Sequence, residues 1–424
     1  MVALFRSAKA RLGLIVVGRY PVAMITSLLL SVLLAAPAQE VPAPDPDPLA
    51  KAPTVSAAQI TKAQKRAVQI LLALQESMDD DSGEAVLDEW PYEGVYRVRG
   101  EIPSGYRVGG TSIVAEALLE SSEARKQREV RKAVERALDF VLEMLETRDM
   151  QSGFKGTYDV RGWGHTYALS FMLTMRRLEA VPKGKEEVVD LTVRWLVETL
   201  TATEIIENGG WNYSRRAGAK KPNAPSPFMT APTLMTLFEA KRQGESVSDD
   251  VINRGLGALE SARHGESGAF VYAGSAGRRA EDVPGAIGRM PVSELTLHLA
   301  GRGSLDRIRA SIDAFFEHWE WLEIRRRQNG THIPPYGIAP YYFFYAHRYV
   351  AAAIEALPEA ERADYRAKLY SLLWMIREDS GGWNDRVFPR SENFGTAMTL
   401  FALQAPGAPA PAGWAPTLAE PPVK

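Results

Sequence analysis

Arginine and aromatic side chains recur together in the segments that precede the most apolar stretches of this 424-residue sequence. A guanidinium group binds a carboxylate or sulfate through two parallel hydrogen bonds, and an aromatic face stacks on an apolar ligand surface. If the fold brings these segments to one end, they predict a site for an anionic glycan or an amphipathic lipid. The alternative is that these arginines pair with acidic residues of the same loops. The candidate ligand-binding residues are Arg161, Trp163, Tyr167, Arg289, Tyr341, Tyr342 and Arg386.

Two residues have the chemistry of acid–base catalysts. His165 stands directly before a predicted apolar helix over residues 166–175, and a helix N-terminus lowers the pKa of an imidazole, which suits a general base. Glu294 lies at the start of another apolar helix and is the candidate acid. A lone histidine among aromatic residues is also a common packing residue, so the alternative for His165 is a structural role.

Metal chemistry has little support in the composition. The sequence contains no cysteine and six histidines, with no His-x-x-x-His pair. Thiolate zinc sites and disulfides are therefore excluded, and a histidine site would need ligands from distant segments. We expect no metal and no cofactor. The net charge of −2 gives no indication of nucleic-acid binding.

The two ends of the sequence differ in composition from the rest. Residues 1–38 combine a basic segment, an apolar run over 22–36 and a small-residue site at 36–38, which is the pattern of a signal peptide. We therefore expect a secreted or periplasmic protein with no membrane span after cleavage; an uncleaved membrane anchor is the alternative. Residues 39–56 read as a Pro-rich linker, and residues 405–424 as a Pro/Ala-rich tail.

Between these ends, a glycine-aromatic loop recurs every 52 to 70 residues. An amphipathic helix precedes each loop and a far more apolar helix follows it, as in residues 128–147 and 166–175. Amphipathic helices have one wet face, whereas helices that are apolar nearly all round are buried. Residues 57–404 are thus predicted to form an all-α fold, an α/α toroid (α6/α6 barrel) of six helical hairpins. The loops lie at residues 82–83, 152–154, 208–211, 268–270, 330–332 and 380–383.

Two of these loops carry a family resemblance. Asn208-Gly209-Gly210-Trp211, and Ser380-Gly381-Gly382-Trp383 with the apolar stretch 394–403, resemble the repeat of squalene and hopene cyclases and of protein prenyltransferase β subunits. The resemblance implies a terpenoid cyclase-like toroid. No cluster like the cyclases' Asp-x-Asp-Asp acid precedes an apolar helix here, and the prenyltransferase zinc site needs a cysteine. The resemblance therefore implies an exported repeat protein that lacks both chemistries and binds a ligand or partner at its loop end.

Two enzymatic alternatives remain open, so the sequence alone leaves open whether the protein is an enzyme. The first is a polysaccharide lyase or a glycosidase on an α/α toroid. A glycosidase needs two facing carboxyl groups, and the sequence does not show how Asp88, Glu89, Glu294 and Asp385 are paired. The second is an atypical terpenoid cyclase that uses Glu294 as its single acid.

Overall fold

The computed structural model describes residues 47–78, 87–94, 96–154, 160–213, 223–277, 282–328, 332, 334–386 and 388–415. These residues belong to one unit of the chain, Pro42–Lys424. The predicted signal peptide, most of the predicted linker and residues 416–424 of the tail lie outside the described residues, as do Gly83 and Gly330 of two predicted loops. Within the described ranges, no helix has the length and apolar character that a membrane crossing needs.

Six amphipathic helices form an outer layer. In the second of them the side chains of Val130, Val134 and Leu138 are buried on one face, while charged residues between them are exposed. This division follows the helical period of the sequence. The outer helices are α1 (Ala57–Ala73), α3 (Arg128–Glu146), α5 (Glu186–Ala202), α7 (Asp249–Ala262), α10 (Leu305–Arg326) and α12 (Glu359–Met375).

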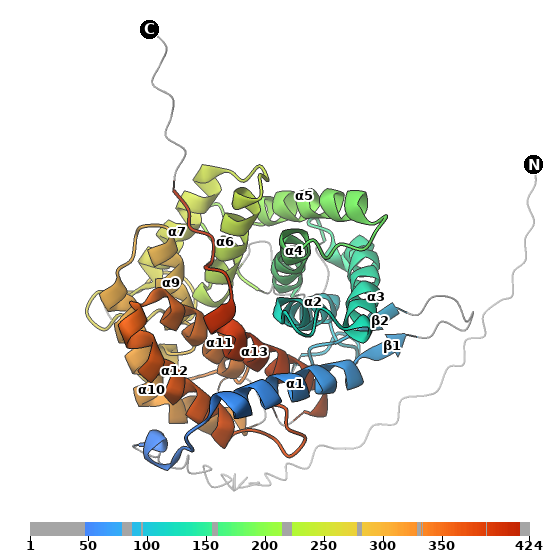
Figure 1. Cartoon of the computed structure of the whole chain (residues 1–424). Helices are drawn as coiled ribbons and strands as arrows, with labels where there is room; N and C mark the ends of the chain where they lie inside the picture. Colours follow the sequence, from blue (N-terminus) through green and yellow to red (C-terminus); the bar gives the residue numbers. More distant parts are fainter. Residues whose placement is uncertain are drawn as a thin grey trace, which may run out of the picture. The chain divides into compact units, whose positions relative to one another are not determined.

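Six apolar helices form an inner ring. Each contacts the next along the chain, and the last contacts the first, so the ring is closed (Figure 1). The prediction of an all-α toroid of six hairpins is thereby confirmed. The inner helices are α2 (Ser104–Glu120), α4 (Arg161–Arg177), α6 (Pro227–Arg242), α9 (Met290–Leu299), α11 (Tyr342–Ala356) and α13 (Glu392–Gln404). Smaller elements are the helix α8 (Val283–Ala286), the antiparallel strands β1 (Glu76–Met78) and β2 (Leu87–Glu89), and four short 3-10 helices.

A buried tryptophan joins outer and inner helices in three of the repeats. The backbone N–H of Trp211 donates to the hydroxyl of Thr230 on α6 at 3.0 Å, and its indole N–H donates to the carbonyl of Leu200 on α5 at 2.7 Å. Trp90 and Trp383 make the same two kinds of bond in their own repeats. The small hydroxylated residues at these positions therefore hold the loop tryptophan, which accounts for the recurring Gly-Gly-Trp and Thr.

Helices α2, α4 and α13 begin earlier than the sequence suggests, and glycines in their first turns allow close packing. A Cβ atom on Gly105 would lie 2.4 Å from the carbonyl oxygen of Val160, and one on Gly109 would lie 2.3 Å from the ring of Trp163. Helix α4 starts at Arg161, so His165 lies within its first turns and does not precede the helix. Glycine is unfavourable in helices by propensity, which is why the boundary was placed too late.

The two ends of the ring differ. Connections from outer to inner helices are long and include the glycine-aromatic loops; they reach the N-terminal ends of the inner helices, which we call the loop end. Connections from inner to outer helices are short, such as 243–248 and 357–358. They lie at the C-terminal ends of the inner helices, which we call the turn end.

Candidate ligand cavity

Aromatic side chains fill the centre of the ring near the loop end. The ring of Tyr92 lies 4.5 Å from that of Phe394 and 5.6 Å from that of Trp163, measured between centroids. Trp163 in turn meets Tyr167 at 5.1 Å. A second group joins Phe228 of α6 to the tyrosines that open α11. All of these side chains are buried, so this layer is packed core.

The candidate residues Arg289, Arg386, Tyr341 and Tyr342 lie in this aromatic layer. Arg289 donates to the carbonyl oxygens of Phe270 and Gly285, each at 2.8 Å, and its guanidinium lies over the ring of Tyr342. The guanidinium of Arg386 lies 5.9 Å from the centroid of the Tyr341 ring. The structure brings these four residues into one region and buries them there.

A buried acid, Asp385, belongs to the same layer. Its Oδ2 accepts a hydrogen bond from the hydroxyl of Tyr92 at 2.9 Å, and Arg386 donates to that hydroxyl at 3.0 Å. Burial raises the pKa of Asp385 to about 6, against the opposing effect of Arg386. Its Oδ1 has no hydrogen-bond partner among the described residues.

Arg161 lies beside a small cavity of about 140 Å³. Its guanidinium donates to the carbonyl oxygen of Gln151 and, at 2.8 Å, to that of Phe154. Arg161 therefore holds the preceding loop against the start of α4.

His165 is completely buried. It occupies the place in α4 that threonine occupies in α2 and α13, next to a glycine that packs closely. Its Nε2 lies 2.8 Å from the carbonyl oxygen of Met150, in the preceding loop. Burial lowers the pKa of His165 to about 4. The residue does not line either cavity.

Glu294 lies on α9 and faces the outer layer. Arg263, at the end of α7, donates to its two carboxylate oxygens at 3.3 and 3.2 Å. Burial raises the pKa of Glu294, with Arg263 acting in the opposite direction. Glu294 and His165 are on non-adjacent inner helices, and neither lines the large cavity described next.

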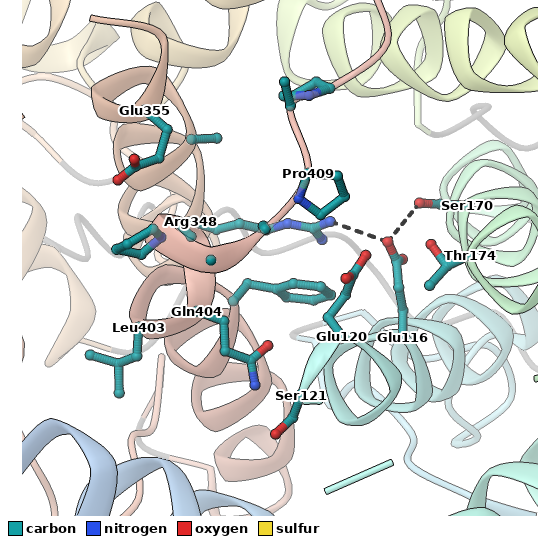
Figure 2. A pocket seen from close by; sticks show the side chains of 18 of the residues that line it. Glu116, Glu120, Ser121, Ser170, Thr174, Arg348, Glu355, Leu403, Gln404 and Pro409 are labelled. Atoms are coloured by element: carbon teal, nitrogen blue, oxygen red, sulfur yellow. Dashed lines mark hydrogen bonds and ion pairs between the residues drawn. The ribbon is translucent and has the colours of Figure 1, made fainter. Parts of the chain in front are cut away.

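A cavity of about 1010 Å³ lies at the turn end of the ring (Figure 2). The C-terminal halves of all six inner helices line it, together with residues 405–412 after α13. Of the predicted site residues, only Tyr167 is among its lining residues. The main candidate site is thus at the opposite end from the predicted one.

The centre of the cavity wall is an ion pair between α2 and α11, the two inner helices on either side of α13. Arg348 of α11 points across the cavity, and its guanidinium lies 3.7 Å from Oε1 of Glu116 on α2. Ser170 of α4 donates to the same oxygen at 3.0 Å. Behind Arg348, the ring of Phe401 lies 3.8 Å from its guanidinium carbon. The arginine is therefore held by a charge on one side and an aromatic face on the other.

Glu116 retains an unused oxygen. Its side chain is buried, and its Oε2 has no hydrogen-bond partner among the described residues. Burial raises the pKa of Glu116, and the opposing effect of Arg348 is smaller. Glu120, one turn later on the same helix, is paired with Arg177 of α4. Two carboxyl groups in different surroundings thus lie along one wall of the cavity.

The sequence does carry a signal for this site. Glu116 and Arg348 are ionisable residues inside helices whose other residues are nearly all apolar and buried. A charge at such a position is rarely buried without a partner. Binding residues concentrate in loops, so the sequence prediction favours the loops over these two helical positions. Within the described ranges, no group of three or more histidine and carboxylate side chains is arranged to hold a metal ion.

Comparison with known proteins shows the fold. The sequence matches no protein-family model and no curated protein. The α-1,6-mannanase GH76A of Salegentibacter sp. HEL1_6 superposes with a TM-score of 0.52 at 10% identity, over 82% of this chain and 99% of that one. A GH76 α-mannanase of Bacteroides thetaiotaomicron gives 0.51 at 10% identity, over 82% and 96%. A D-mannose isomerase also gives 0.51 at 10% identity, over 83% and 98%.

These structures correct the family resemblance. The squalene cyclase and prenyltransferase interpretation is wrong, because the similar structures are GH76 mannanases and no family model supports it. The Gly-Gly-Trp loops that suggested it are explained by the bonds of the tryptophan to the helices on either side. At 10% identity the likeness shows an α/α toroid shared with sugar-processing enzymes, which agrees with the glycosidase alternative.

Proposed function

We propose that this protein is a glycoside hydrolase that binds a neutral glycan in the turn-end cavity. The observation that carries the proposal is the buried carboxyl of Glu116, a residue that lines a cavity of about 1010 Å³, with one oxygen held by Ser170 and the other buried without a partner among the described residues. A raised pKa favours the protonated form, which a general acid needs.

Glu120 is the proposed second carboxylate. Side chains one helical turn apart have Cβ atoms about 5 to 6 Å apart, so the carboxyl groups of Glu116 and Glu120 can reach the same bound sugar. Retaining glycosidases hold their two carboxyl groups about 5 Å apart. In the proposed reaction Glu116 gives its proton to the glycosidic oxygen while Glu120 attacks the anomeric carbon. Water then releases the sugar, and Glu116 takes a proton from that water.

The similar structures support a sugar ligand, and their adjacent aspartates can be compared with the described part of this chain. Variants of the Salegentibacter mannanase were solved with α-1,6-mannotriose and α-1,6-mannotetrose bound, and two aspartates adjacent in its sequence were replaced to inactivate it. In the described part of this chain, adjacent aspartates occur only at Asp249 and Asp250, which begin the outer helix α7. Asp79, Asp80 and Asp81 are also adjacent in the sequence, and they lie outside the described residues.

The charges of the cavity favour a neutral glycan over an anionic one. Arg348 faces Glu116, Arg177 is paired with Glu120, and Arg242 is paired with Glu239. A paired carboxylate cancels most of the positive potential of an arginine, so these arginines attract an anion only weakly. Polar groups from Ser170, Thr174 and Gln404, all at the cavity wall, suit hydroxyl groups.

The loop-end arginines give no support for an anionic glycan or an amphipathic lipid either. Arg97 is paired with Glu93, Arg107 with Glu89 and Arg390 with Glu76. Arg215, Arg216, Arg278 and Arg279 lie outside the described residues.

The test is hydrolysis of neutral oligosaccharides, beginning with α-1,6-mannotriose and a panel of other linkages. We expect release of reducing sugar, and a loss of about 10²- to 10⁴-fold in Glu116→Gln, the range that general acid catalysis contributes. Glu123→Gln is the matched control, since this glutamate also borders the cavity but is exposed and paired only with Lys126. Binding without hydrolysis, measured by calorimetry, would show a sugar-binding protein; no binding of any glycan would overturn the proposal.

We further propose that the protein acts outside the cytoplasm, because residues 1–38 have the composition of a signal peptide. N-terminal sequencing of the protein recovered from its native cells is the check. A mature chain that begins near Gln39 is expected, whereas an intact N-terminus would favour the membrane-anchored alternative.

A further inference from the structure

The residues after α13 cross the turn end as a segment that begins with a short 3-10 helix (Ala405–Gly407) and has no regular secondary structure after it, which we call the strap (residues 405–415). It leaves α13 at Gln404, passes the C-terminal half of α11 and reaches the far side of the ring at α6, α7 and α9 (Figure 1). Residues 405–412 line the large cavity. Pro409 of the strap lines the same cavity as Arg348 and Glu116 (Figure 2).

Trp414 anchors the far end of the strap. Its backbone N–H donates to the carbonyl oxygen of Leu299 at 2.9 Å, and its indole N–H lies 3.2 Å from Oδ1 of Asp249. The indole also stacks on Phe238, with ring centroids 6.4 Å apart and an interplanar angle of 15°. Trp414 and Ala412 are buried. This end of the strap is thus docked on three helices by specific contacts.

The middle of the strap is held weakly. Residues 406–410 are exposed, and the bond from Arg242 to the carbonyl oxygen of Ala410 is long, at 3.4 Å. The prolines at 406, 409 and 411 have no N–H to donate. A segment with few buried contacts and few hydrogen bonds opens at low free energy, so the strap is able to move while the helices stay folded.

The cavity has no continuation through the ring in the described residues. On its axial side, Tyr167 lines the cavity and also packs against Trp163 of the aromatic layer. The hydroxyl of Tyr345, in the same layer, donates to the carbonyl oxygen of Phe228 at 2.9 Å. A ligand therefore enters and leaves at the turn end, beside or beneath the strap.

We propose that the cavity takes the end of a glycan chain and that the strap determines how much of the chain is admitted. This inference rests on the proposed glycosidase function. A blind pocket accommodates a chain terminus, whereas an open groove accommodates the interior of a polymer. The strap narrows the mouth of this pocket, so the enzyme is expected to remove sugars from chain ends and to act poorly on chain interiors.

The absence of cysteine from the chain allows a direct test of the strap that needs no glycan. Ala352→Cys places one thiol in the cavity wall on α11, next to the start of the strap. Ala314→Cys, a partly buried alanine on the outer helix α10 that does not line the cavity, is the matched control. The probes are a small maleimide and a maleimide attached to a long polyethylene glycol chain.

Opening the strap should change access for the large probe only. We expect the small maleimide to label Ala352→Cys at similar rates with or without Trp414→Ala. We expect the large maleimide to react with Ala352→Cys at least about tenfold faster when Trp414→Ala is also present. With Trp414 in place, the open state of the strap is a minor state that holds at most about a tenth of the molecules. Ala314→Cys should not respond, and Trp414→Phe should keep most of the protection. If Trp414→Ala fails to fold, Pro409→Gly with Pro411→Gly loosens the strap without touching its anchor.

The same variants then test the chain-end inference with manno-oligosaccharides. The intact protein should release monosaccharide first, and Trp414→Ala should yield longer products. Equal labelling of Ala352→Cys in all variants would overturn the role of the strap whatever the protein binds. Faster labelling without hydrolysis of any glycan would overturn the proposed function and leave the strap as a cover over another ligand. Long products from the intact protein would overturn the chain-end inference.

Discussion

At the scale of single residues, the pairing of Glu116 with Arg348 combines structure and proposed chemistry. Both side chains lie inside otherwise apolar inner helices, and each partly offsets the cost of burying the other's charge. The pair also leaves one carboxylate oxygen without a partner. A core that needed only stability is better served by apolar residues at both positions, so the pair is consistent with selection for function.

Removal of one partner should therefore be costly. We expect Arg348→Met to lower the free energy of unfolding by about 3 kcal/mol at neutral pH, since it leaves the buried Glu116 carboxyl without its cation. Urea unfolding is the measurement. The double variant Glu116→Gln with Arg348→Met should recover most of that loss. A single variant as stable as the unchanged protein would show that the pair contributes little to folding.

His165 affects the pH dependence of the stability of the fold. Burial lowers its pKa to about 4 from an ordinary value of 6.5. Below pH 6.5 the unfolded chain binds a proton that the folded chain excludes, so this residue makes stability fall as the pH drops from 6.5 towards 4. His347, whose pKa burial lowers to about 3, acts in the same direction. Both effects make the fold sensitive to acid.

Replacement of His165 by the threonine of the other repeats should reduce this sensitivity. We expect His165→Thr to lose about 2 kcal/mol less stability than the unchanged protein between pH 7 and pH 5. Asp385, whose pKa is raised to about 6, has the opposite effect on stability as the pH falls. This effect is the same in both proteins, so it cancels from the difference between them. Urea unfolding at the two pH values decides. Equal losses would show that His165 is not excluded from protonation in the fold. A large loss of hydrolytic activity at pH 7 would instead favour the predicted catalytic role.

At the scale of elements, close packing of α2 on α4 depends on glycines at the start of α2. We expect Gly105→Ala to lower the free energy of unfolding by about 1 to 3 kcal/mol, because its Cβ would meet the backbone of Val160 at 2.4 Å. Gly257→Ala on α7 is the control: nothing lies within 4 Å of that Cβ, and alanine is favoured in a helix by about 1 kcal/mol. The two variants should therefore shift the urea midpoint in opposite directions. If both variants raise the urea midpoint, the contact between position 105 and the backbone of Val160 relaxes to accept the added methyl group.

The elements also show what a sequence can and cannot predict here. Periodicity located the outer helices to within a few residues, as in 128–147 for α3 (Arg128–Glu146). It failed at the starts of α2, α4 and α13, where glycines serve packing between helices and not turns. The cavity was missed for a different reason. Glu116, Ser170 and Arg348 come from three repeats, and only closure of the ring brings them together.

At the scale of the whole molecule, the closed ring has a packed loop end and a turn end that carries the cavity. The long loops carry the aromatic and arginine residues that suggest a site, yet Arg289, Arg386 and Tyr341 are buried in the ring, and Arg97 and Arg107 pair with glutamates. The turn end, with its short connections, carries the cavity and the strap. A toroid with one packed end has a single entrance, and this links the proposed chemistry at Glu116 to the proposed role of residues 405–415.

Ligand binding at this entrance should be insensitive to salt. Arg177, Arg242 and Arg348 each face a glutamate, and the five glutamates that line the cavity outnumber these arginines and Lys65 together, so no strong positive field extends from it. Between about 0.01 M and 1 M salt the Debye length falls from about 30 Å to about 3 Å, which removes most long-range steering between exposed charges. We expect the affinity of the inactive Glu116→Gln variant for a neutral oligosaccharide to change by less than about twofold over this range, and its affinity for a uronic-acid oligosaccharide to be lower at both salts. Calorimetric titration at the two salt concentrations is the measurement. Tighter binding of the acidic sugar, weakened by salt, would show that the arginines and not the carboxylates select the ligand.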